Sequence, residues 1–137
     1  MDNRRPLRNS HQRQLVLSIV KSSYNHPIAD EVYEIARYQD SSISKGTVYR
    51  NLNLLADLGE IRKLHMPFGP DHYDFNLVNH YHFICRCCNK VVDASIPYHD
   101  ELNQAQAQLP GYLTEWHKLI LVGLCAECNS RQNEIQN

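Results

Sequence analysis

Apolar residues recur at helical spacing in three segments of the first half of the chain. Residues 11–23 place apolar side chains three to four positions apart, and residues 26–38 do the same, with Pro27 suited to a first helical turn. Residues 41–59 open on serines suited to N-capping and end at Gly59, a residue typical of the C′ position. The positions predicted to face the core are Leu15, Val16, Ile19, Val20, Ile28, Val32, Ile35, Val48, Leu52 and Leu55.

The pattern then changes to that of strands. Residues 60–75 hold two β-rich runs around a Pro-Phe-Gly-Pro turn, which after three helices gives the outline of a winged helix-turn-helix. Further on, Tyr81 and Phe83 alternate with histidines, residues 90–96 read as a second strand, 97–109 as a helix, 112–125 as a third strand and 126–137 as a polar tail. We therefore predict an α+β fold, with a winged-helix domain over residues 1–77 and a small α+β domain over residues 78–137.

Composition and charge add modest constraints to this outline. Two cores of about 60 to 80 residues each are marginal without a staple. Residues 1–65 hold 10 Lys/Arg against 7 Asp/Glu, and residues 66–137 hold 4 against 8, so the first part is better suited to a polyanion. No stretch reaches the length of a membrane span, and no apolar run follows the first arginines. We expect a cytoplasmic protein without a membrane partner.

The third predicted helix carries a polar face opposite its apolar stripe. This face holds Lys45, Tyr49, Arg50 and Asn53, side chains that suit the major groove of double-stranded DNA. Any amphipathic helix turns polar residues outward, so a plain solvated face stays an alternative. Basic residues in the hairpin and near the start could supply phosphate contacts, and they favour DNA: Arg62, Lys63, His65, Arg4, Arg5, Arg8 and Arg13.

Two cysteine pairs predict a structural metal site. Cys85-x-x-Cys88 and Cys125-x-x-Cys128 are separated by 36 residues, and each turn holds two thiolates close enough for one tetrahedral zinc ion. A thiol–disulfide pair is the main alternative, but the βαβ context of such motifs is missing. An iron–sulfur cluster is a further alternative, less favoured because the chain lacks a cluster-binding spacing. Cys87 could replace Cys88 as a ligand or be a free thiol; the C-x-x-C spacing favours Cys88.

Three further ligand-type side chains are left over in the same region. His80 and His82, two apart on a predicted strand, project from the same face, and Asp93 on the neighbouring strand could join them. A His-x-His pair alone is a weak signal, and a pair of surface imidazoles explains it equally well.

Taken together, the segments "GTVYRNLNLLADLGEI", "HYDF", "HYHFICRCCNKVVD" and "LCAEC", in this order and spacing, resemble the ferric uptake regulator family of metal-dependent repressors. The resemblance runs from about His11 to Cys128. It implies a homodimer with amino-terminal winged-helix DNA-binding domains and carboxy-terminal dimerisation domains.

The resemblance also implies a regulatory metal at the hinge between the domains. By position, its ligands here would be His26, Asp74, His80, His82 and Asp93. Two alternatives remain open: His26 could cap the helix that follows it, and Asp74 could be a salt-bridge partner in the hairpin. Some members have a third site; its matching positions here hold Asn79, Tyr81 and His117, so we expect no third metal and a structural strand residue at His117.

The three-histidine, two-aspartate set is similar to that of the peroxide-sensing branch, whereas iron-uptake members usually carry glutamate at the carboxylate positions. Such a set accepts Fe(II) or Mn(II). In that branch Fe(II) chemistry oxidises the histidines that correspond to His26 and His80, and DNA is released, while the Mn(II) form resists peroxide.

The sequence thus predicts a transcriptional repressor that binds a palindromic A/T-rich operator and releases it on oxidation. The alternative within this class is an iron- or zinc-status repressor without peroxide sensing. We do not expect an enzyme, either a metallohydrolase built on His80, His82 and Asp93 or a thiol oxidoreductase built on Cys87. No general-base motif such as H-E-x-x-H is present, and the paired cysteines suit a closed site. A pure protein-interaction module would give no reason for the arginine-bearing helix.

Overall fold

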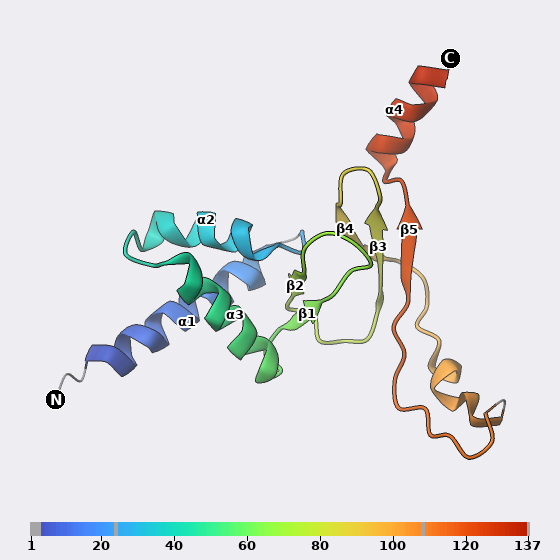
Figure 1. Cartoon of the computed structure of the whole chain (residues 1–137), viewed down its shortest axis with the longest axis horizontal. Helices are drawn as coiled ribbons and strands as arrows, with labels where there is room; N and C mark the ends of the chain where they lie inside the picture. Colours follow the sequence, from blue (N-terminus) through green and yellow to red (C-terminus); the bar gives the residue numbers. More distant parts are fainter. Residues whose placement is uncertain (1–3, 24, 108, 137) are drawn as a thin grey trace. The chain divides into compact units, whose positions relative to one another are not determined.

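The computed structural model describes residues 4–23, 25–107 and 109–136 (Figure 1). The chain divides into two compact units, Met1–Leu77 and Val78–Asn137. The first is the helical unit and the second the stranded unit, named for the elements that dominate them. The predicted α+β fold class is confirmed. No described helix is long and apolar enough to cross a membrane.

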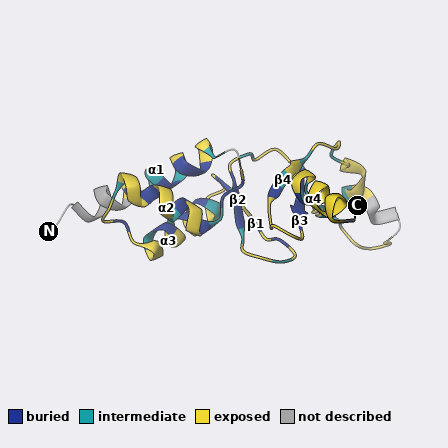
Figure 2. Cartoon of the chain, turned by 90° about the horizontal axis from the view of Figure 1, so that it is seen from above, coloured by how far each residue is buried: buried dark blue, intermediate teal, exposed yellow. Residues whose placement is uncertain are grey.

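Three helices build the core of the helical unit: α1 (Arg4–Ser22), α2 (Ala29–Gln39) and α3 (Lys45–Asp57). In the described part of each helix, buried residues lie on one face and exposed residues on the other, as expected of helices with one apolar face (Figure 2). The prediction for Ile35 is wrong, because its side chain is 42% exposed and Ala36 takes the inward position instead. The core side chains of the helices are Val16, Ile19, Val20, Ala29, Val32, Ala36, Val48, Leu52 and Leu55.

Helix α3 has a defined start and a defined stop. The side chain of Ser44 accepts a hydrogen bond of 3.1 Å from the backbone amide three residues on. At the other end Gly59 has φ 75°, and the amides of Gly59 and Glu60 donate to the carbonyls of Ala56 and Leu55. This pair of bonds is a Schellman motif, which satisfies carbonyls that the helix leaves open. The predicted serine N-cap and the stop at Gly59 are confirmed, but the helix begins at Lys45, so residues 41–43 of the predicted segment precede it.

The predicted hairpin is present as two short antiparallel strands, β1 (Arg62–Leu64) and β2 (His72–Asp74). Its register pairs Arg62 with Asp74 and Leu64 with His72. β2 is buried along its whole length, so the hairpin is anchored on the helices through this strand. The arrangement of three helices and a hairpin is the winged helix-turn-helix that the sequence predicts.

The stranded unit contains a three-stranded sheet in the order β4-β3-β5. β3 (Tyr81–Cys85) lies in the middle, antiparallel to β4 (Val91–Ala94) and parallel to β5 (Ile120–Gly123). Between β4 and β5 lies the 3₁₀ segment η1 (Asp100–Ala107), and α4 (Ala126–Gln136) follows β5 (Figure 1). Few side chains are buried here, so we expect this small unit to need an additional stabilising element, such as a bound metal ion.

Three predictions for this unit are wrong in detail. Of the helix expected over 97–109, residues Asp100–Ala107 form a 3₁₀ helix with a non-helical break at Gln104, and Asn103 uses its side chain to bond His117. The strand expected over 112–125 is confined to four residues, because β3, its partner, offers only a short edge. The polar tail is a helix, which grows from the turn at Cys125, where the Asn129 amide donates to the Cys125 carbonyl at 2.8 Å.

Candidate metal centres and DNA interface

The two cysteine pairs meet at one end of the sheet in the stranded unit. Parallel pairing of β3 with β5 sets Cys85 opposite Gly123, which brings the two C-x-x-C turns side by side. The sulfurs of Cys85, Cys88, Cys125 and Cys128 all lie within 4.8 Å of one another. The Cys88 and Cys125 sulfurs are 3.8 Å apart, and zinc–sulfur bonds of about 2.3 Å in a tetrahedron require about 3.8 Å between sulfurs. The donor set therefore fits a zinc ion.

The electrostatics of these thiols point the same way. Backbone amides, first that of Cys125 and then that of Cys88, lower the pKa of the Cys85 thiol to about 6. The Cys125 thiol and then burial raise the pKa of Cys128 well above its usual range. The Cys85 thiolate is thus favoured while the thiols of Cys88 and Cys128 resist ionisation, since negative sulfurs at this spacing repel one another. A divalent cation removes that conflict.

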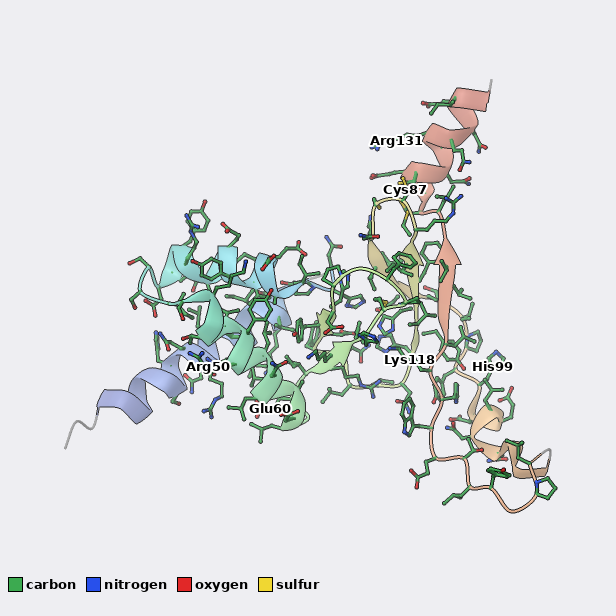
Figure 3. The ribbon with its side chains drawn as sticks, viewed as in Figure 1. Arg50, Glu60, Cys87, His99, Lys118 and Arg131 are labelled. Carbon is green, nitrogen blue, oxygen red and sulfur yellow. The ribbon has the colours of Figure 1, made fainter. Side chains whose placement is uncertain are left out.

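Cys87 lies outside this cluster. Its side chain is exposed in the turn that follows β3 (Figure 3), and the four-sulfur group uses Cys88. The structure therefore favours the C-x-x-C pair over Cys87, as the spacing predicts.

A second group of ligand-type side chains lies on the β3–β4 pair of the same unit. The register sets Asp93 directly opposite His82. The Asp93 Oδ1 atom is 3.1 Å from His80 Nε2 and 3.5 Å from His82 Nε2, and the two imidazole centroids are 4.5 Å apart. The Nδ1–H of His80 donates to the carbonyl of Val78 at 2.5 Å, which leaves Nε2 as its available ligand atom. Three ligand atoms therefore converge in this unit.

Within the helical unit, His26 and Asp74 form a buried pair. His26 Nδ1 is 3.6 Å from Asp74 Oδ1, and the side chains are 8% and 2% exposed. The capping alternative for His26 is not what the structure shows, since Glu31 accepts from the Ile28 amide at 3.1 Å at the start of α2. Asp74 also accepts from the Asn76 amide at 2.9 Å, which fixes its carboxylate. A buried imidazole next to a buried carboxylate could offer two ligand atoms to a metal ion.

His72 ties the two segments of this pair together, a role that the sequence reading missed. Its Nδ1–H donates to the carbonyl of His26 at 2.7 Å, and the neighbouring Tyr73 amide donates to the Pro27 carbonyl at 2.9 Å. A β-bridge between Ile28 and His72 completes the connection. The Nε2 atom of His72 is buried without a hydrogen-bond partner in the described part of the chain. The segment before α2 and strand β2 are therefore fixed against each other.

Two of the three positions that match a third metal site in the family, Tyr81 and His117, belong to a hydrogen-bonded cluster. Tyr81 Oη lies 2.7 Å from His117 Nε2, and the other ring nitrogen of His117 donates to Asn103 Oδ1 at 2.7 Å. The Tyr98 ring stacks on the His117 ring with centroids 4.6 Å apart. His117 precedes β5, so its prediction as a strand residue is wrong.

The four predicted DNA-binding residues all lie on exposed positions of α3, while Val48, Leu52 and Leu55 face the core. The Arg50 guanidinium bonds to Thr47 Oγ1 at 3.1 Å, and it lies over Gly46, where a Cβ atom would meet it at 3.2 Å. The glycine therefore leaves room for Arg50 on this face. Lys45, Tyr49 and Asn53 each contact a side chain from another segment of the unit.

The other basic residues are placed less uniformly. Arg62 of the hairpin bonds to the carbonyl of Leu77, while Lys63 and His65 are exposed. Arg13 is half-buried. The side chains of Arg4, Arg5 and Arg8 lie outside the described part of the structure.

Comparison with known proteins agrees with this combination of a winged helix and clustered metal ligands. The chain matches the Ferric uptake regulator family over residues 4–122 and belongs to it, a class of metal-binding transcription regulators. The peroxide-responsive repressor PerR of Staphylococcus epidermidis is 35% identical over 127 residues, which are 93% of this chain and 85% of the relative. PerR of Staphylococcus aureus strain Mu50 is 34% identical over 125 residues, 91% of this chain and 84% of the relative.

Solved structures extend the likeness to three dimensions. The Helicobacter pylori ferric uptake regulator Fur, described as having three functional metal-binding sites, aligns with a TM-score of 0.76 and 25% identity over 87% of this chain and 80% of that one. The Campylobacter jejuni peroxide stress regulator aligns with a TM-score of 0.73 and 28% identity over 91% of this chain and 94% of that one.

Proposed function

We propose that this protein is a metal-dependent transcriptional repressor that binds operator DNA as a homodimer and releases it when peroxide oxidises its histidine ligands. The observation that carries the proposal is the second donor set, His80, His82 and Asp93 together with the buried pair of His26 and Asp74. Nitrogen and carboxylate donors of this kind suit Fe(II) or Mn(II), whereas the four sulfurs suit Zn(II). In this proposal the four-sulfur set therefore holds the structural metal, and the histidine and carboxylate set holds the regulatory metal.

In this proposal His26 and Asp74 of the helical unit and His80, His82 and Asp93 of the stranded unit ligate one ion. Ligands from both units fix one arrangement of the reading helices. To move a population from 1% to 99% in that arrangement, the ion must bind it better than the alternatives by about 5.5 kcal/mol. Loss of one ligand would remove much of that difference, which makes the site a switch.

The reading surface in the proposal is the exposed face of α3. Arg50 and Lys45 supply phosphate or guanine contacts, and Tyr49 and Asn53 supply contacts to base edges. A dimer would present two such helices to successive half-sites of a palindrome, which we expect to be A/T-rich. Since the target is chromosomal DNA, we place the protein in the cytoplasm.

Exposed apolar side chains on the stranded unit support the homodimer of this proposal. Trp116 is 72% exposed, and Val122 on the edge strand β5 is 51% exposed. Large apolar side chains exposed on so small a unit favour a protein interface. A second copy of the chain is the partner proposed for this surface.

The first test of the proposal is metal-dependent binding to DNA. Zinc-loaded protein with Mn(II) is expected to retard a palindromic A/T-rich duplex in a mobility-shift assay at least about 100-fold more tightly than the same protein without Mn(II). The expected difference follows from the linkage between ion binding and the DNA-competent arrangement. Equal binding with and without Mn(II) would refute the switch.

The second test concerns peroxide. In this step peroxide would be the net two-electron oxidant and the histidine ring the electron donor, and bound Fe(II) would only activate the O–O bond and be regenerated. One oxygen atom is added at a ring carbon of His26 or His80, and the other leaves as water. Mass spectrometry of the treated Fe(II) form should show the gain of one oxygen in peptides that contain His26 or His80, together with release of the duplex.

The Mn(II) form is the control for this experiment and should show neither change. If the Fe(II) form also keeps its mass and its DNA while a chelator releases it, the protein is the alternative, a repressor that responds to iron or zinc status alone.

A further inference from the structure

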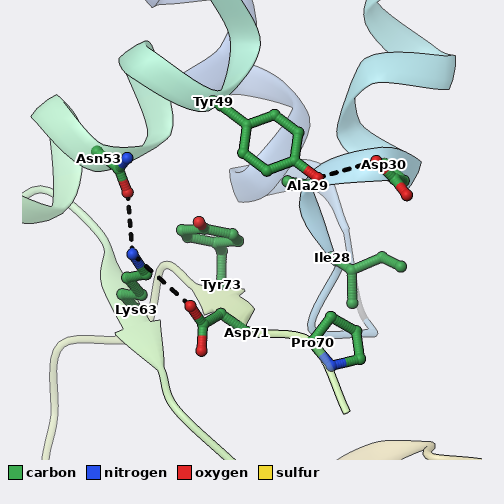
Figure 4. Close-up of a pocket in the computed structure, with 9 residues that line it drawn as sticks. All are labelled: Ile28, Ala29, Asp30, Tyr49, Asn53, Lys63, Pro70, Asp71 and Tyr73. Atoms are coloured by element: carbon green, nitrogen blue, oxygen red, sulfur yellow. Dashed lines mark hydrogen bonds and ion pairs between the residues drawn. The ribbon is translucent and has the colours of Figure 1, made fainter. Parts of the chain in front are cut away.

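Asp30, in the first turn of α2, is bonded to two of the residues on the reading face of α3. Its Oδ1 atom accepts a hydrogen bond from the Tyr49 hydroxyl at 2.9 Å (Figure 4). The same atom lies 3.0 Å from the Lys45 ammonium. The Lys45 bond, followed by that of Tyr49, lowers the pKa of the Asp30 carboxyl, and Asp30 raises the pKa of Lys45. Both groups are therefore charged at neutral pH, and the reading face carries a built-in anion.

A second carboxylate acts on the hairpin side of the same surface. Asp71 lies 3.6 Å from the Lys63 ammonium, and Lys63 donates to Asn53 Oδ1 at 3.1 Å (Figure 4). Asp71 also lies 2.8 Å from His65 Nδ1. These contacts connect the hairpin to α3.

A pocket of about 130 Å³ lies between the two carboxylates. It is lined by the start of α2, by α3 and by the hairpin, and the side chains of Asp30, Tyr49, Asn53, Lys63 and Asp71 surround it (Figure 4). An anion in this pocket would meet two negative charges. Asp30 instead pairs with Lys45, and Asp71 pairs with Lys63. Each carboxylate thus takes a position beside a lysine that a DNA phosphate would otherwise take.

We infer that Asp30 is a specificity-determining residue: it orients the Tyr49 ring on the reading face and masks the charge of Lys45. The inference rests on the proposed operator binding. Random DNA attracts the protein through phosphate charge alone, and the Asp30 carboxylate weakens that attraction. Operator DNA uses the oriented ring, so the same carboxylate supports its binding. Asp30 therefore widens the gap between operator and random DNA.

Two substitutions separate orientation from charge. The asparagine side chain of D30N keeps an oxygen that can accept from the Tyr49 hydroxyl but has no charge, and D30A removes both features. Both variants are expected to bind random duplex about threefold to fivefold more tightly, an effect of the size of one exposed charge pair. Their salt dependence should steepen by about one phosphate contact, since Lys45 becomes free.

Operator binding should distinguish the two variants. D30N is expected to keep the operator affinity within about twofold, whereas D30A should lose about tenfold because the Tyr49 ring is no longer held. When Tyr49 is replaced by phenylalanine, the difference between the two substitutions at position 30 should disappear. That dependence is not expected of a residue that only stabilises α2.

Glu60, exposed beyond the end of α3 (Figure 3), offers the matched control. E60Q makes the same change in net charge and should leave the ratio of operator to random binding unchanged. The inference is overturned if D30N and D30A match E60Q in that ratio and in salt slope. If wild-type protein with Mn(II) does not distinguish operator from random duplex, the proposed function itself has failed.

Discussion

Replacement of Cys128 by serine is expected to abolish zinc binding and unfold the stranded unit. Cys128 is 8% exposed, and its sulfur belongs to the four-sulfur cluster. Structural zinc contributes about 10 to 16 kcal/mol of apparent binding free energy in small domains, more than a sheet with so few buried side chains can replace. Metal analysis should show loss of the zinc, and circular dichroism should show loss of sheet signal, while helical signal from α1 to α3 remains.

Cys87→Ser is the matched control, because Cys87 is exposed and lies outside the cluster. It should keep one zinc per chain and the wild-type melting curve. A C128S protein that keeps both would show that the staple of this unit is something other than the four-cysteine site.

The second large effect is expected at the proposed regulatory ion. His82→Ala and Asp74→Asn should each reduce operator binding in excess Mn(II) to the level of the metal-free protein, a loss of about 100-fold or more. His82 is 5% exposed and faces Asp93, and the asparagine at position 74 keeps an acceptor for the Asn76 amide while it removes the charge. Mobility shifts at several Mn(II) concentrations would measure the loss.

The two substitutions test different parts of the proposal because one lies in each unit. If one ion takes ligands from both units, the double variant should be no worse than either single variant, since each already removes the switch. A fully responsive D74N beside an unresponsive H82A would place the ion in the stranded unit alone. His99→Ala, an exposed histidine bonded to Glu101, is the control and should keep both zinc and the Mn(II) response.

Local sequence patterns predicted the parts of this fold that depend on neighbouring residues. The apolar stripe of α3 and its stop at Gly59 follow from helix periodicity and from the φ value that a C′ residue adopts. The position of Asp93 opposite His82 follows from the pairing of two consecutive strands. These features involve spacing along one or two adjacent elements, which a sequence displays directly. The meeting of the two C-x-x-C turns joins distant segments, and it was predicted from the ligand spacing that both turns share.

Contacts between distant segments were not visible in that way. Asp30 reads as an acid at a helix start, and its bond to Tyr49, 19 residues away, depends on how α2 packs against α3. His72 reads as one more polar residue in the hairpin, yet it holds the carbonyl of a residue 46 positions earlier. Helix α4 was missed because it is polar on all sides and takes its start from the Cys125 turn. Tertiary packing decides each of these cases.

The junction of Cys88 with Cys125 has a consequence for how this chain can vary. The 36 residues between them form a closed loop, because the two cysteines at its ends lie next to each other. The entropy of closing a loop grows slowly, by about 0.6 kcal/mol for each doubling of its length. Insertions and deletions around the exposed turn at Gly111 should therefore accumulate among homologues with little loss of stability. The two C-x-x-C turns at the ends of the loop should keep their spacing.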